Sequence, residues 1–185
     1  MVNRALTVLS ASLIAQLEQQ NHIVAGSARP LGAVATGIAV PQGAPSVAID
    51  SSQGLKSSLT AAKGLYVPDL HQSSAGIHIA GMLKALGLNE LLADRIHEYP
   101  NGATAMRELA RNGADGMIGC TQVTEIMNTT GVRLEGKLPS EHALNTVYMA
   151  AVCSRALQPV LAAKFVEALS SNASSALRLR SGFAI

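Results

Sequence analysis

The sequence is poor in aromatic residues and in charge. Tryptophan is absent, aromatic residues make up 3% of the 185 residues, and charged residues make up 14% with a formal net charge of +2. Nucleic-acid-binding domains gather Lys and Arg on one surface and often stack bases on aromatic rings. The densest basic segment here is Arg178-Leu179-Arg180, so we expect no nucleic-acid partner.

Cysteine is nearly absent, and no metal-binding motif occurs. The two cysteines, Cys120 and Cys153, each lie in an apolar stretch, which is typical of buried free thiols. The histidines are scattered and no glycine-rich nucleotide motif opens a helix, so we expect neither a metal nor a cofactor. Cys120 is a formal candidate for a nucleophile, but nothing near it in sequence orients a base. We therefore expect a protein that is not an enzyme.

Long hydrophobic runs are also missing, because polar residues or glycines interrupt every apolar stretch before it reaches the length of a transmembrane helix. The start, Met1–Arg4 followed by residues 5–15, superficially resembles a signal peptide. However, Ser10 and Ser12 dilute its apolar part and no convincing cleavage site follows. We expect an amphipathic helix capped by Ser10 or Ser12 instead, and a cytoplasmic protein if the chain is complete as given.

What the sequence does have is an alternation of short strands and helices. Hydrophobic residues make up 48% of the chain, which is ample for the core of one domain or of two small lobes. The expected strands cover residues 33–40, 65–69, 96–99, 116–120, 132–134 and 145–152. The expected helices cover residues 52–63, 77–86, 89–95, 102–112, 159–169 and 174–180. Strands separated by helices indicate parallel pairing and an α/β fold.

Two of these helices begin with residues suited to binding a small anion. Their starts are Ser73-Ser74-Ala75-Gly76 and Asn101-Gly102-Ala103-Thr104. Backbone N–H groups in the first turn of a helix have no intrahelical acceptor and lie at the positive end of the helix dipole. Small residues leave these donors accessible, although ordinary capping and turn formation would use the same residue types.

A further polar pair, Thr121 and Gln122, follows the expected strand 116–120. Open α/β sheets bind ligands at the carboxyl ends of their strands, so this pair is a third candidate contact, although it can equally cap a helix near Glu125. His78 lies one turn into the first candidate helix, within an apolar run. It fits a structural histidine better than a ligand contact.

Several segments, in their order and spacing over almost the whole chain, resemble a known family. They are Val8–Ile14, Gly26–Leu31, Gly37–Pro45, Ser73–His78, Leu86–Leu88, Gly113–Gly116, Gln122–Ile126 and Gly182-Phe183. Together they resemble the type II periplasmic substrate-binding proteins of ABC transporters, in the molybdate-binding-protein-like branch.

The resemblance implies two α/β lobes joined by crossover strands, with a small anionic ligand held between them by N–H groups at helix starts and by hydroxyls. We expect residues 1–38 and 131–185 to form the first lobe and residues 39–130 the second, with linkers near 33–40 and 129–138. By resemblance, the full-length family member is periplasmic and works with an ABC transporter permease. The implied ligand contacts are Ser73, Ser74, Ala75, Gly76, Asn101, Gly102, Ala103, Thr121 and Gln122.

The sequence departs from the family pattern in two ways. A family member opens with a strand, a Ser-bearing loop and further elements before anything like Val8-Leu9-Ser10. We therefore expect an incomplete first lobe, whose exposed strand near Leu6–Leu9 favours a homodimer or poor solubility. Gln122 stands where the molybdate proteins have a Tyr, so the expected ligand is a molybdate-like oxyanion or a small organic acid.

Two alternatives share the expected fold. One is the effector-sensing domain of a transcriptional regulator, which needs a DNA-binding segment elsewhere in its chain. The other is a remnant that binds no ligand.

Overall fold

The computed structural model describes residues 5–185 and divides into two compact units. Unit 1 comprises the described part of Met1–Val34 together with Asn145–Ile185, and unit 2 comprises Ala35–Leu144. The strand β2 (Arg29–Pro41) contributes to both units. The signal-like start Met1–Arg4 lies outside the described residues. Within residues 5–185, no helix combines the length and the apolar character needed to cross a bilayer.

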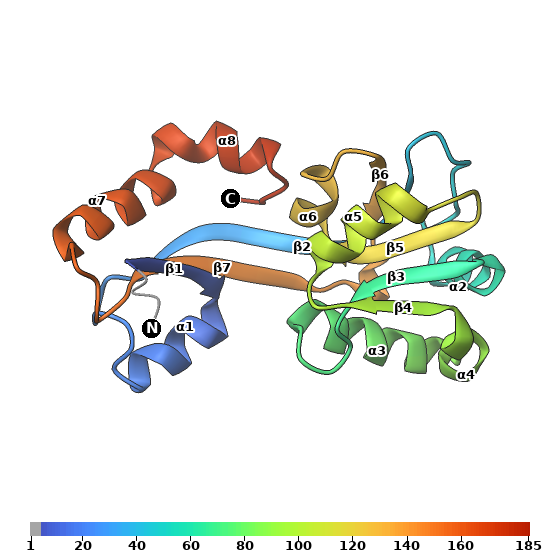
Figure 1. Cartoon of the computed structure of the whole chain (residues 1–185), viewed down its shortest axis with the longest axis horizontal. Coiled ribbons are helices and arrows are strands. Elements are labelled where there is room, and N and C mark those ends of the chain that lie inside the picture. Colours follow the sequence, from blue (N-terminus) through green and yellow to red (C-terminus); the bar gives the residue numbers. More distant parts are fainter. Residues whose placement is uncertain (1–4) are drawn as a thin grey trace. The chain divides into compact units, whose positions relative to one another are not determined.

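Unit 2 is a mixed sheet covered by helices on both faces (Figure 1). Its elements are α2 (Ser52–Ala61), β3 (Gly64–Pro68), α3 (Ser74–Leu86), α4 (Asn89–Leu92), the 3-10 helix η1 (Ala93–Arg95), β4 (Ile96–Tyr99), α5 (Gly102–Asn112), β5 (Met117–Gln122), α6 (Val123–Met127), β6 (Val132–Lys137) and the 3-10 helix η2 (Ser140–His142). The strand order is β2-β5-β3-β4, with β6 pairing to β2. β3 is parallel to β4 and β5, whereas β2 is antiparallel to β5 and β6.

The central strand β3 explains why helices cover both faces of this sheet. Successive side chains of a strand point to opposite faces. Leu65 and Val67 pack with α2 and α3 on one face, while Tyr66 packs with α5 on the other, and all three side chains are buried. A strand that is apolar on both faces must be covered on both, as parallel strands with crossover helices are.

Unit 1 is a smaller sheet with one long helix on each face. Its elements, besides the first part of β2, are β1 (Leu6–Ser10), α1 (Ala11–Gln19), β7 (Asn145–Val152), α7 (Pro159–Ser170), the 3-10 helix η3 (Asn172–Ser174) and α8 (Ser175–Arg180). β7 lies between β1 and β2, so β1 is an edge strand. Ala150 and Val152 of β7 pack with α7, and Ala151 packs with Ile14 of α1, because alternate strand residues face opposite sides.

Most expected elements are confirmed, and the differences concern the end of β5, the place of β6 and the limits of the two units. β5 runs through Gln122, so Thr121 and Gln122 are strand residues instead of following the strand. Residues 132–137 form β6 and pair with β2 inside unit 2, although we expected a linker between lobes there. The chain passes back to unit 1 between Leu144 and Asn145, and the expected lobe limits after residues 38 and 130 fall inside unit 2.

Candidate functional site

The candidate contacts from the sequence lie along one edge of the unit 2 sheet. α3 follows β3, α5 follows β4, and Thr121 and Gln122 end β5. Because β5, β3 and β4 are parallel neighbours, their carboxyl ends lie side by side. The backbone N–H of Asp69 donates to the carbonyl oxygen of Tyr99 at 2.7 Å, which joins the ends of β3 and β4 directly. This edge is where open α/β sheets bind ligands.

The start of α3 is capped by Ser73, whose Oγ accepts the N–H of Gly76 at 3.2 Å. Ser74 is exposed, while Ala75 and Gly76 are buried. By helix geometry, the N–H groups of Ser74 and Ala75 have no acceptor within the helix. Ser73 is therefore occupied as a cap, and the donors that the helix itself leaves unused belong to Ser74 and Ala75.

The loop before α3 is held by two carboxylates. Asp69 accepts hydrogen bonds from the N–H groups of His71 (2.8 Å) and Gln72 (2.9 Å), and these bonds lower the pKa of Asp69 below its ordinary value. Glu98 of β4 accepts the N–H of Leu70 at 2.9 Å. These bonds fix the direction in which the chain enters α3. They also place negative charge on the loop, which reduces the positive potential that the α3 dipole alone would give.

The start of α5 has the same form but a less favourable setting for an anion. Asn101 caps it, accepting the backbone N–H of Thr104 at 2.8 Å and the Thr104 hydroxyl at 2.9 Å. Gly102 lies so close to Glu125 that an added Cβ would overlap the Glu125 carboxylate. The Thr121 hydroxyl donates to the same carboxylate at 2.5 Å. The negative charge of the Glu125 carboxylate disfavours the binding of an anion at the α5 start. The α3 start is therefore the stronger candidate for an anion-binding site.

The end of β5 brings in a residue that sequence reasoning missed. Gln122 is 5% exposed and is paired with Thr36 of β2 in the antiparallel register. Thr36 is 1% exposed, and its Oγ1 has no hydrogen-bond partner among the described residues. The sequence shows Thr36 only as one residue of a small-residue strand. Its place beside Gln122 follows from a pairing between distant segments.

Unit 1 contains a strand-to-helix junction of the same kind, which we had interpreted only as a cap. Ser10 ends β1 and caps α1, with its Oγ 3.4 Å from the N–H of Leu13 and 3.1 Å from the Oγ of Ser12. Ser10 is 7% exposed. The signal in the sequence is the apolar run Leu6–Leu9 followed directly by a serine and a helical pattern.

His78 and Cys120, two other side chains with potential chemistry, lie in surroundings that suit a structural role. The Nε2 of His78 lies 2.8 Å from the carbonyl oxygen of His142, so half-buried His78 ties α3 to η2. Cys120 is fully buried, and burial raises the pKa of its thiol to about 12, which leaves almost no thiolate at neutral pH. Across residues 5–185, no group of three His, Cys, Asp or Glu side chains is placed to hold a metal ion.

Comparison with known proteins assigns the chain to a family. The model of the family "Bacterial extracellular solute-binding protein" matches residues 6–184. The comparison with curated proteins gives no match.

Several solved structures share the fold. The periplasmic molybdate-binding protein of Azotobacter vinelandii is 16% identical with a TM-score of 0.77, and the match covers 100% of this chain and 79% of that one. The sulfate-binding protein of Mycobacterium tuberculosis is 15% identical with a TM-score of 0.68, covering 97% and 68%. A substrate-binding protein of an ABC transporter from Agrobacterium tumefaciens is 11% identical with a TM-score of 0.70, covering 96% and 62%.

These low identities show the fold alone, and they confirm the expected α/β periplasmic-binding-protein-like architecture. The family model shows family membership, which the structural matches do not, because it matches the sequence over nearly its whole length. This chain belongs to the family of bacterial extracellular solute-binding proteins.

Proposed function

We propose that this protein is the solute-capturing component of an ABC importer and that its solute is a small anion. Membership of the solute-binding family supports the transport role. The main support for an anionic solute is the pair of helix starts, of α3 and α5, at the carboxyl ends of the adjacent parallel strands β3 and β4. Neither helix has an acidic residue in its first turn. Helix starts of this kind bind anions through unpaired N–H groups and the helix dipole.

The α3 start is the principal contact in this proposal. The N–H groups of Ser74 and Ala75 and the hydroxyl of Ser74 would donate to the anion. Ser73 and Gly76 shape the turn, because an added Cβ at Gly76 would overlap the carbonyl of Asp69. The absence of a side chain there lets helix and loop approach closely.

The α5 start and the end of β5 complete the proposed contacts. Asn101, Gly102 and Ala103 would contribute a second set of N–H donors, weakened by the neighbouring carboxylate of Glu125. Thr121 lies beside Gly102, and Gln122 follows Thr121 as the last residue of β5. The amide of Gln122 can donate to either an oxyanion or a carboxylate, so both ligand classes fit its chemistry.

The fold relatives favour an oxyanion, since two of them are named as molybdate-binding and sulfate-binding proteins. A binding protein of this family hands its solute to a membrane permease. We therefore propose that this chain acts outside the cytoplasmic membrane and that its partner is the permease of an ABC importer.

Calorimetric titration with molybdate, sulfate, phosphate and small carboxylates tests the proposal. We expect saturable binding of at least one of these anions and a loss of at least about tenfold in affinity for Ser74→Asp, because the new carboxylate occupies the donors. The matched control is Gln53→Asp, which adds the same charge to the exposed first turn of α2. We expect its affinity to match the wild type. Unchanged affinity in Ser74→Asp, or no binding of any of these anions by the wild type, contradicts the proposal.

A further inference from the structure

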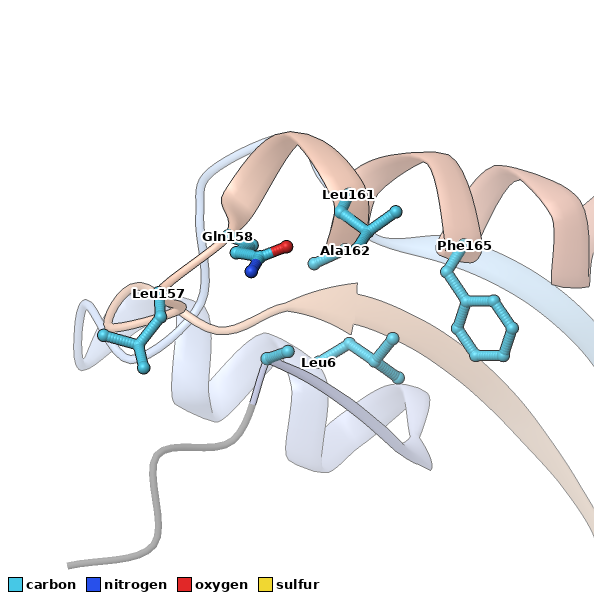
Figure 2. A pocket seen from close by; sticks show the side chains of 7 residues that line it. Leu6, Leu157, Gln158, Leu161, Ala162 and Phe165 are labelled. Atoms are coloured by element: carbon cyan, nitrogen blue, oxygen red, sulfur yellow. The ribbon is translucent and has the colours of Figure 1, made fainter.

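The pocket between β1 and α7 in unit 1 does not suit the proposed solute. Figure 2 shows its lining, which includes Leu6, Leu157, Gln158, Leu161, Ala162 and Phe165. Gln158 is the one polar side chain among these six. Apolar side chains give an anion no hydrogen-bond donor, so this pocket is not a second anion site.

Unit 2, in contrast, contains a buried hydroxyl without a partner. Thr36 of β2 is 1% exposed, and its Oγ1 makes no hydrogen bond within residues 5–185. Its backbone is fully bonded: the Thr36 N–H donates to the carbonyl oxygen of Leu144, and the Thr36 carbonyl accepts the N–H of Leu138, each at 3.0 Å. Both neighbours belong to unit 2. Buried polar groups are nearly always hydrogen-bonded, so the unpaired hydroxyl calls for an explanation.

The Thr36 side chain points to the sheet face that α3 covers, as does Gln122. Ile38, two residues along β2, packs with α3, and Cys120, two residues before Gln122 on β5, belongs to the same cluster. Strand residues two apart share a face. The antiparallel register pairs Thr36 directly with Gln122. The Cβ atoms of such a pair lie about 4.5–5.5 Å apart, so the long Gln122 side chain is within reach of the Thr36 hydroxyl.

Gln122 in turn lies level with the start of α3. β5 is parallel to β3, with Gly119 opposite Tyr66, and this register continued along both strands places Gln122 beside Asp69. The first turn of α3 packs against Asp69, because an added Cβ at Gly76 would overlap the Asp69 carbonyl. Neighbouring strands are about 4.8 Å apart. The Gln122 side chain can therefore extend toward an anion at the α3 start, whereas β2 lies one strand farther away.

We propose that Thr36 positions Gln122 for the solute. In the anion complex, the Thr36 hydroxyl donates to Oε1 of Gln122, and the NH₂ group of Gln122 then points toward the anion. This inference rests on the proposed anion site at the α3 start. An amide has a donor end and an acceptor end, and only the donor end attracts an anion. Thr36 is thus a positioning residue that acts through Gln122, while the N–H groups of Ser74 and Ala75 contact the solute themselves.

Thr36→Val tests this role, because it keeps the shape of the side chain and removes the hydroxyl. Calorimetric titration with molybdate, sulfate and small carboxylates should show a loss of at least about tenfold in affinity, since the Gln122 amide is no longer held in one orientation. The urea midpoint, measured without these anions, should be at least as high as that of the wild type, because no hydrogen bond within the protein is lost. Thr36→Ser keeps the hydroxyl and should bind within about threefold of the wild type.

The matched control is Thr129→Val, which removes a hydroxyl that does have a partner. Thr129 is half-buried, and its Oγ1 donates to the carbonyl oxygen of Glu125 at 2.7 Å. This variant should show the opposite pattern, with a lower urea midpoint and the affinity of the wild type. The contrast separates a hydroxyl used for binding from one used for stability.

The side-chain NH₂ signals of Gln122 in a 15N NMR spectrum report its orientation directly. They should shift on addition of the anion in the wild type and in Thr36→Ser, and shift less in Thr36→Val at saturation. A change in affinity that came only from altered packing would not produce this difference between the variants.

Three results overturn the role of Thr36 alone: wild-type affinity in Thr36→Val, an equal loss of affinity in Thr36→Ser, or a urea midpoint of Thr36→Val as low as that of Thr129→Val. The last result would show that the hydroxyl already has a partner within the protein. A wild type that binds none of the anions overturns the proposed function and this inference together, so the two failures are distinguishable.

Discussion

At the residue scale, the glycines of the candidate site are constrained by packing as well as by ligand access. An added Cβ at Gly102 would overlap the Thr121 hydroxyl and the Glu125 carboxylate, and one at Gly76 would overlap the carbonyl of Asp69. The sequence suggests small residues at a helix start, but it does not show which neighbours make them necessary. Those neighbours come from another strand or from the preceding loop, so only the folded chain reveals the constraint.

Replacing Gly102 by Ala should lower the free energy of unfolding by about 1–3 kcal/mol, because the methyl group forces Thr121 or Glu125 to move. Gly81→Ala on α3 is the control, since nothing lies within 4 Å of a Cβ there. That change should instead stabilise the protein by up to about 1 kcal/mol through helix propensity. Urea denaturation of both variants measures the difference. Equal effects of the two changes would show that Gly102 is not closely packed.

Cys120 should be unreactive in the folded protein. Its thiol is fully buried and its pKa is raised to about 12 by burial, so the thiolate is a minor species until strongly alkaline pH. We expect iodoacetamide at neutral pH to label Cys120 only after denaturant is added, with peptide mass spectrometry locating the label. Rapid labelling of Cys120 in the native protein would reopen the possibility of a nucleophile.

At the scale of elements, local signals in the sequence predicted most of unit 2, and pairings between distant segments account for the rest. The helix starts at Ser73-Ser74 and at Asn101-Gly102, and the end of α3 at residue 86, were predicted because each depends on a few consecutive residues. The end of β5, the place of β6 and the pairing of Thr36 with Gln122 were not. Each depends on hydrogen bonds to β2, which the sequence of the strand alone does not specify.

Arg178 joins three segments of unit 1 and should be important for its stability. Its guanidinium donates to the carbonyl oxygens of Leu31 (2.6 Å), Ser170 (3.2 Å) and Ser171 (2.9 Å), so it binds the C-terminal end of α7 and the start of β2. Arg178→Ala should lower the free energy of unfolding by about 2–3 kcal/mol, because it removes three hydrogen bonds from a charged donor that joins these segments.

The matched control for Arg178 is Arg180→Ala, an exposed position on the same helix, which should cost no more than about 0.5 kcal/mol. Thermal and urea denaturation measure both variants. If the two substitutions destabilise the protein equally, the Arg178 contacts contribute nothing specific to unit 1.

At the scale of the whole molecule, the order of segments along the chain was sufficient to predict the α/β periplasmic-binding-protein-like fold. The family match over residues 6–184 now places the chain among the solute-binding proteins. Neither the fold nor the family match identifies the ligand. Proteins that are only 11–16% identical to this chain share the fold, and two of them are named for different anions. The expected incomplete first lobe stays a prediction, as does the choice between an oxyanion and an organic acid.

We propose that the helix starts of unit 2 capture a small anion, and an amide NMR titration detects that contact residue by residue. With molybdate or sulfate added to 15N-labelled protein, we expect saturable shifts that are largest at the N–H groups of Ser74 and Ala75 and smaller at Gly102 and Ala103. The amide of Gln53, in the first turn of α2, should not shift. Equal shifts at all helix starts, or saturable shifts confined to other residues, would show that these two helix starts do not hold the anion.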